Sequence, residues 1–169
     1  MDDEPDVGKE LTRPPTDEDL ARLAARLNEL GARYIVVGGL AVIAAGFTRA
    51  TMDIDLLVDT SPENDELIRK ALESLPEKAV LELGPGEIEN YVVVRVCDEF
   101  TVDLMAEACG LTYDDAKDLI EYREHLGVMI PFASLQLLWK TKQTIRPKDA
   151  WDRSFLQREL ENRGEWPVE

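Results

Sequence analysis

The stretch Y-I-V-V-G-G-L-A-V-I-A-A-G-F-T-R-A-T-M-D-I-D-L-L-V-D, residues 34–59, joins two apolar runs through a pair of glycines. The first run ends at Gly38 and Gly39, an apolar segment long enough for a short helix follows, and the second run contains Asp53 and Asp55. Because successive side chains of a strand point to opposite faces, we expect the two aspartates to share one face. Two carboxylates held so close repel each other unless a positive group lies between them, and the usual occupant is a divalent cation. The stretch therefore predicts a strand–helix–strand unit with a cation site.

The composition is that of an ordinary globular protein with one sizeable core. The chain has 169 residues, of which 44% are hydrophobic and 32% are charged, and its formal net charge is −16. So acidic a chain is not expected to bind nucleic acid broadly, because such binding normally uses a basic surface. The longest apolar stretch, residues 34–47, is too short to span a bilayer and contains a glycine pair. The first residues, M-D-D-E-P-D, lack the basic and apolar regions of a signal peptide, so we expect a cytoplasmic protein with no membrane partner.

Periodicity and turn residues divide the chain into a core and flanking parts. We predict a flexible acidic lead-in over residues 1–15, a core over 16–110, a helical C-terminal part packed on the core over 111–163, and a tail over 164–169. Expected helices are 17–30, 40–45, 62–75, 133–145 and 148–161. Expected strands are 33–37, 52–58, a weaker one at 79–83, a hairpin of 91–96 with 100–105, and a short strand at 128–130.

A third carboxylate stands in the second strand of the predicted hairpin. Asp103 lies among Val102, Leu104 and Met105, where an apolar core would not place it. Each signal alone also has a plain structural explanation, since a glycine pair can serve only a tight turn and an Asp-x-Asp pair can lie on a solvated face. The combination of a glycine pair, thirteen intervening residues, the aspartate pair and a later aspartate is much more specific.

This combination resembles the signature of the nucleotidyltransferase superfamily, which includes polymerase-beta-like and aminoglycoside-modifying enzymes. The run R-A-T-M-D-I-D-L at residues 49–56 is similar to the R-x-T-x-D-I-D-L run of the small bacterial branch that contains AbiE-type toxins of toxin–antitoxin systems. R-P-K-D at residues 146–149, with Asp152, resembles an element in the C-terminal helices of those proteins. The resemblance covers most of residues 18–160 and implies an α/β nucleotidyltransferase fold, a mixed sheet flanked by helices with a helical C-terminal part. Many relatives have a histidine where this chain has Ala45, so any role of that histidine is absent here.

The resemblance implies a donor site for a nucleoside triphosphate. The phosphates would lie against Gly38 and Gly39, where backbone N–H groups can approach them. Asp53 and Asp55 would hold two Mg²⁺ ions, or Mn²⁺ in their place, that bridge the phosphate oxygens. Asp103 would share the second ion and help to deprotonate the acceptor hydroxyl.

Basic residues are expected to neutralise the triphosphate, and the sequence leaves their assignment open. Arg49 either contacts phosphate or pairs with Asp59 or another acid. Either Lys140 or Lys142 would face the site, while each alone can belong to a solvated helix face. The charged residues of the element at 146–152 either contact substrate or form an ion-pair network that locks the last helix.

Three functions are compatible with these residues. The first is Mg²⁺-dependent transfer of a nucleoside monophosphate to an acceptor hydroxyl on a small cationic molecule, a protein or a tRNA. The second is a catalytically silent protein that binds a basic partner, as in a toxin–antitoxin pair, which the acidic composition favours. The third retains the cations but uses water as acceptor, which makes a phosphohydrolase or nuclease.

Overall fold

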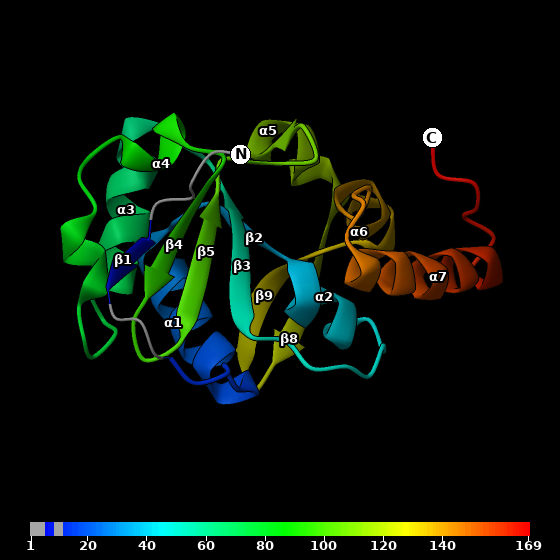
Figure 1. Ribbon diagram of the computed structural model, residues 1–169, viewed down its shortest axis with the longest axis horizontal. Helices are drawn as coiled ribbons and strands as arrows, with labels where there is room; N and C mark the ends of the chain where they lie inside the picture. Colours follow the sequence, from blue (N-terminus) through cyan, green and yellow to red (C-terminus); the bar gives the residue numbers. More distant parts are fainter. Residues whose placement is uncertain (1–5, 9–11) are drawn as a thin grey trace.

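The computed structural model describes residues 6–8 and 12–169, and its centre is a seven-stranded mixed sheet (Figure 1). The strand order is β1-β4-β5-β3-β2-β9-β8, and a separate two-stranded ribbon is formed by β6 and β7. The strands are β1 (Asp6–Gly8), β2 (Tyr34–Val37), β3 (Asp53–Val58), β4 (Val93–Cys97), β5 (Thr101–Met105), β6 (Glu107–Ala108), β7 (Leu111–Thr112), β8 (Ile120–His125) and β9 (Val128–Ala133). The helices are α1 (Asp17–Leu30), α2 (Gly38–Ala44), α3 (Pro62–Leu72), α4 (Glu87–Asn90), α5 (Tyr113–Ala116), α6 (Leu135–Thr141) and α7 (Pro147–Asn162), with 3-10 turns η1 (Ala79–Glu82) and η2 (Lys117–Leu119).

The middle of the sheet is formed by the two apolar runs of the opening stretch. β2 is buried along its whole length and lies between β3, to which it is antiparallel, and β9, to which it is parallel. β3 continues the sheet on its other side in parallel with β5, and β5 forms an antiparallel hairpin with β4. On β3, Ile54 and Leu56 are fully buried, whereas Asp53 and Asp55 alternate with them and point to the other face. The predicted strand–helix–strand unit and the hairpin are therefore confirmed.

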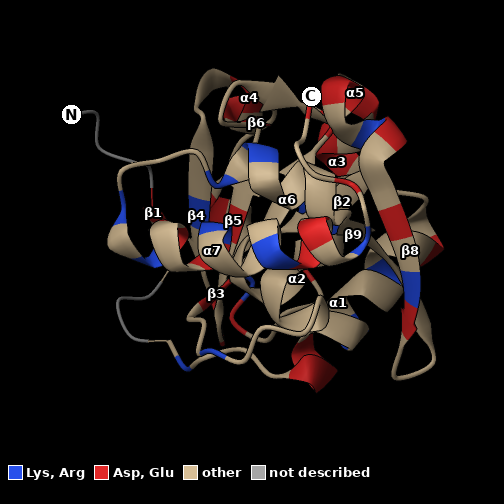
Figure 2. Ribbon diagram, turned by 90° about the vertical axis from the view of Figure 1, so that its right-hand side faces the viewer, with Lys and Arg blue, Asp and Glu red and all other residues tan. Residues whose placement is uncertain are grey.

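Helices cover the sheet unevenly. α1 lies behind the strands in Figure 1 and packs against α3 and β9. Thr16 begins α1 with a capping box, and Ser61 caps α3 with Pro62 in the first turn. On the side of β2 away from β5, α6 packs against both α2 and α7, and Figure 2 shows α6 and α7 together at this end of the molecule. The predicted α/β architecture, a mixed sheet flanked by helices with helices near the C-terminus, is confirmed.

Several segments differ from the sequence-based expectation. Residues 120–133, in a region expected to be mostly helical, form the hairpin β8–β9, which extends the main sheet. Residues 79–82 form the 3-10 turn η1 instead of a weak strand, and α6 ends at Thr141 instead of continuing to residue 145.

The N-terminal segment, expected to be a flexible lead-in over residues 1–15, contains a short strand. Within the lead-in, residues 6–8 form β1, paired in parallel with β4, while residues 1–5 and 9–11 lie outside the described part. The division at residue 110 into core and C-terminal part remains a prediction. Among the described helices, none has both the length and the apolar character that a bilayer crossing requires.

Candidate active site

Each glycine of the pair at the end of β2 is required by a close approach of other atoms. Gly38 has a φ of +69°, and a Cβ built on it would lie 1.9 Å from Oδ2 of Asp55. A Cβ on Gly39 would lie 2.5 Å from the hydroxyl oxygen of Thr51 and 3.0 Å from Nη2 of Arg49. Any larger residue would therefore collide with the site itself. The glycine turn is a structural part of the carboxylate cluster as well as the start of α2.

Three carboxylates meet where β3 and β5 lie side by side. The parallel pairing places Asp55 directly opposite Asp103, and Asp53 is two residues earlier on the same face of β3. One oxygen from each of the three carboxylates lies within 4.8 Å of the others. The sheet therefore brings together the three aspartates that the sequence singled out.

The charge of this triad is not fully compensated by the protein. Burial, together with repulsion from Asp103 and a hydrogen bond to it, raises the pKa of Asp55 to about 7. Burial and the nearby Asp103 also raise the pKa of Asp53, although Arg95 and Lys148 act in the opposite direction. The three converging carboxylates form a set of hard oxygen ligands that fits a divalent cation such as Mg²⁺ or Mn²⁺.

Arg95 contacts the triad and was not among the predicted site residues. It lies on β4 directly opposite Asp103, and its Nε and Nη2 donate to the two Asp103 oxygens at 3.0 and 3.3 Å. Its Nη2 is also 3.8 Å from Oδ2 of Asp53. A signal was present in the sequence, because Arg95 alternates with Val94 and Val96 and therefore points to the face opposite these two buried valines. Pairing the predicted hairpin would have placed Arg95 beside Asp103.

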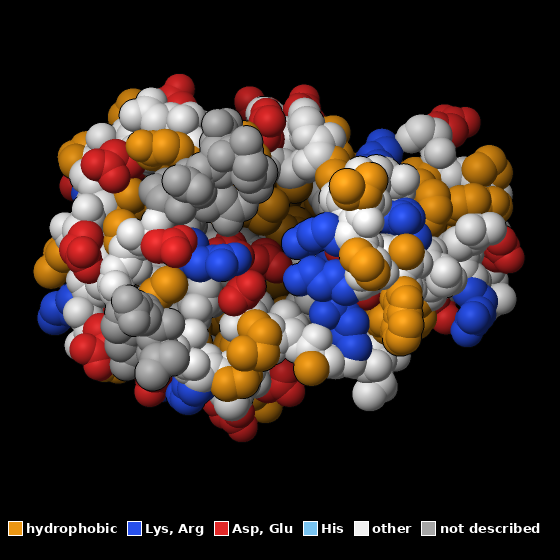
Figure 3. Space-filling view, viewed as in Figure 1, with side chains coloured by type: hydrophobic (Ala, Val, Ile, Leu, Met, Phe, Trp, Pro, Cys, Tyr) orange, Lys and Arg blue, Asp and Glu red, His pale blue; other side chains and the backbone are white. Residues whose placement is uncertain are grey.

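A cleft of about 320 Å³ separates the triad from basic side chains. Figure 3 shows acidic side chains in a hollow at the centre of the molecule, with Lys and Arg side chains on either side. The basic residues that line the cleft, besides Arg95, are Arg49, Lys142, Arg146 and Lys148. The volume falls at the lower end of the ~300–1,000 Å³ range typical of small-molecule sites.

Of the two lysines that the sequence could not separate, the structure brings only Lys142 to the cleft. Lys142 is 5% exposed at its side chain, and its Nζ lies 3.3 Å from Asp149 and 3.0 Å from Asp152. Lys140 is half-buried on α6 and does not line the cleft.

An ion-pair network holds the start of α7 against the cleft. Arg49 pairs with the fully buried Asp152, with Nη2 donating to Oδ2 at 2.9 Å, and Arg146 pairs with Asp149 at 2.9 Å. Lys142 joins the two aspartates into one network. The network that the sequence allowed is therefore present, and Arg49 pairs within it instead of with Asp59.

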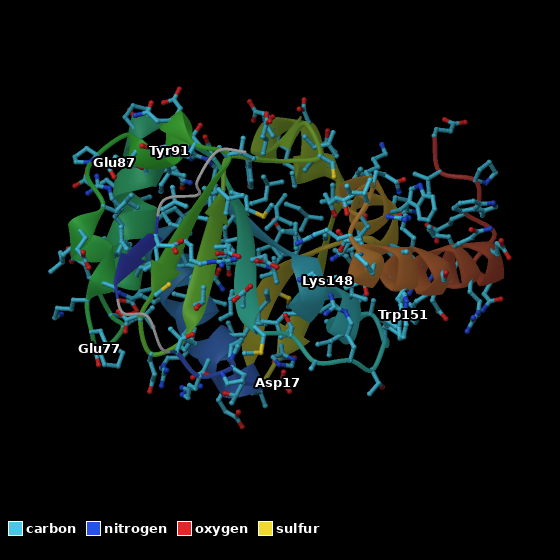
Figure 4. All side chains as sticks on the ribbon, in the orientation of Figure 1. Asp17, Glu77, Glu87, Tyr91, Lys148 and Trp151 are labelled. Atoms are coloured by element: carbon cyan, nitrogen blue, oxygen red, sulfur yellow. The ribbon has the colours of Figure 1, made fainter. Side chains whose placement is uncertain are left out.

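Asp59 lies outside the cleft and pairs with Arg33. Lys148 lines the cleft. Within the described part of the chain, no ion pair involves Lys148. This residue is exposed at the end of α7 nearest the strands (Figure 4). Its charge is therefore available for an anion in the cleft.

The fold and the site combine a mixed sheet with a glycine turn, an acidic triad on neighbouring strands, and basic residues across a cleft. The structure is similar to the crystal structure of "a putative nucleotidyltransferase" from Thermotoga maritima, with a TM-score of 0.54 and 16% sequence identity. The match covers 93% of this chain and 95% of that one. The fold is therefore nucleotidyltransferase-like. No protein-family model matches the sequence, and no curated protein sequence does either.

Proposed function

We propose that the protein is a nucleotidyltransferase that uses Mg²⁺ to move a nucleoside monophosphate from a nucleoside triphosphate to an acceptor hydroxyl. The observation that carries this proposal is the triad of Asp53, Asp55 and Asp103 facing basic side chains across one cleft. Phosphoryl and nucleotidyl transfer depend mainly on positioning and charge neutralisation, and the cleft supplies groups for both. The nucleotidyltransferase-like fold supports the same conclusion.

The three carboxylates would have two different roles, cation binding and proton acceptance. Asp53 and Asp55 would hold the divalent cations, which when bound neutralise the phosphate oxygens of the donor. Asp103 would accept the proton of the acceptor hydroxyl, whose oxygen then forms a bond to the α-phosphorus. The bond from the α-phosphorus to the bridging oxygen breaks, and pyrophosphate leaves with that electron pair.

The glycine turn and the basic side chains would bind the donor. The backbone beside Gly38 and Gly39 is open to the cleft, so the phosphates can approach it closely. Lys148 would contribute a charge not used by any described acid, whereas Arg49 and Lys142 have charges shared with the buried aspartates of the network. Arg49 and Lys142 would therefore mainly shape the phosphate side of the cleft, and Lys148 would contact the triphosphate.

The proposal is tested with purified protein, labelled nucleoside triphosphates and Mg²⁺, using protein, RNA and polycationic small molecules as acceptors. We expect label to appear on one acceptor class and Asp55→Asn to abolish the transfer. Asp114→Asn, the same substitution at an exposed site on α5, is the matched control and should retain activity. Release of free nucleotide without labelled acceptor would instead identify a phosphohydrolase. The absence of both transfer and cation-dependent triphosphate binding would refute the proposal.

The alternative function is binding of a basic protein partner, as in the toxin–antitoxin branch that residues 49–56 resemble. The net charge of −16 favours such a partner. Co-purification of a basic protein at fixed stoichiometry, unchanged in the Asp53→Ala, Asp55→Ala double variant, would support this function. Loss of the partner in that variant would instead link binding to the acidic cleft.

A further inference from the structure

Arg95 forms a salt bridge with Asp103, one of the three aspartates of the triad. Its guanidinium donates to both oxygens of Asp103, and the fork geometry of arginine suits such two-point contact. The contact is enforced by the sheet, because Arg95 and Asp103 are directly opposite each other in the β4–β5 hairpin. The same guanidinium lies 3.8 Å from Asp53. It is therefore an internal positive charge at the edge of the cluster.

Asp53 and Asp55 are less closely paired with basic side chains than Asp103 is. Among the described residues, the ion pairs of the triad are those of Arg95 with Asp103 and, at 3.8 Å, with Asp53, and none of them involves Asp55. A cation held by Asp53 and Asp55 can therefore bind without moving a protein charge. A cation that also used Asp103 would lie beside the guanidinium, where two positive charges repel each other strongly.

We propose that Arg95 is an internal counter-ion that competes with a divalent cation for Asp103, an inference that rests on the cation site proposed above. In the resting protein Arg95 keeps Asp103 paired, so the first cation is shared by Asp53 and Asp55. A cation that uses Asp103 binds only when the guanidinium leaves it. Arg95 is thus a positioning residue: it controls when Asp103 becomes available for cation binding and for proton transfer.

The test measures Mn²⁺ binding by titration calorimetry on the metal-free protein, without nucleotide. Arg95→Gln removes the competing charge and should bind the Mn²⁺ ion that uses Asp103 at least about tenfold more tightly than the wild type does. One unit charge at about 4 Å outweighs a tenfold change in affinity. Arg69→Gln is the matched control, since Arg69 pairs with the buried Asp65 at 2.9 Å on α3, outside the cleft. This control should bind Mn²⁺ with wild-type affinity. A merely structural role for Arg95 would weaken binding or leave it unchanged.

A second measurement uses only the wild-type protein, in case Arg95→Gln does not fold. In ¹⁵N-labelled protein, the Nε–H signal of Arg95 should stay in place while the first Mg²⁺ binds. It should then shift and saturate at higher Mg²⁺, when the hydrogen bond of Arg95 to Asp103 is lost. An Arg95 signal that stays unmoved up to saturating Mg²⁺, or equal affinities of wild type and Arg95→Gln for the cation that uses Asp103, would overturn this inference and leave the proposed function standing. No cation binding by either protein would refute the cation site itself and, with it, this inference.

Discussion

Replacing Asp55 by asparagine removes one negative charge from the triad while almost preserving the shape of the side chain. In the folded, metal-free protein the pKa of Asp55 is raised from 3.8 to about 7 by burial and by Asp103. The folded state therefore holds a proton more tightly than the unfolded chain does. The contribution of Asp55 to stability is complete below pH 4 and is lost as the pH rises from about 4 to about 7.

The expected change in the free energy of unfolding follows from the size of this pKa change. A rise from 3.8 to about 7 corresponds to up to about 4 kcal/mol of destabilisation at pH 8. Asp55→Asn should therefore increase the free energy of unfolding by roughly 2–4 kcal/mol at pH 8, and by little near pH 4, where the wild-type carboxyl is already protonated.

Urea denaturation between pH 4 and pH 8 in the presence of a chelator measures this difference. Mg²⁺ at a hundred times its dissociation constant should then stabilise the wild type by about 2.7 kcal/mol, and stabilise Asp55→Asn much less. Asp114→Asn on the exposed face of α5 should change stability by no more than about 0.5 kcal/mol at any pH. A variant that is less stable than the wild type at pH 8 without metal would refute the idea that the triad carries uncompensated charge.

Three further predictions concern the glycine turn, the first helix and the buried lysine. Gly38→Ala should cost clearly more stability than Gly31→Ala in urea denaturation and should also abolish Mg²⁺ stabilisation. Both glycines have positive φ, which costs about 1–2 kcal/mol for alanine, but only at Gly38 would the new Cβ meet a carboxylate. Asp19→Asn should lower stability by about 2 kcal/mol at pH 7, because the arginine beside Asp19 holds the pKa of Asp19 at about 2. The substitution should have little effect near pH 2, because the contribution of Asp19 is lost as the pH falls from about 4 through about 2. Lys142→Met should cost about 3 kcal/mol because it leaves buried aspartates with less positive charge, whereas Lys140→Met should stay within about 0.5 kcal/mol of the wild type.

Much of the fold was predictable because the relevant signals are local. The two-residue period of a strand assigned Asp53 and Asp55 to one face of β3, and the structure confirms this. The expected helix starts at residues 17 and 62 agree with those of α1 and α3, because the caps Thr16 and Ser61 act locally. The hairpin β8–β9 was partly missed, since β8 is an edge strand with charged residues and shows no buried run.

The sequence by itself singled out the candidate site residues: a glycine pair that permits close approach, and carboxylates in strands that would otherwise be apolar. Only the tertiary structure decided how they meet, because the contacts join residues far apart in the chain. Pairing of β5 with β3 and β4 brought Asp103 to Asp55 and set Arg95 against it. Packing of α6 and α7 selected Lys142 over Lys140, since that choice depends on which side of the helix end faces the buried aspartates of α7.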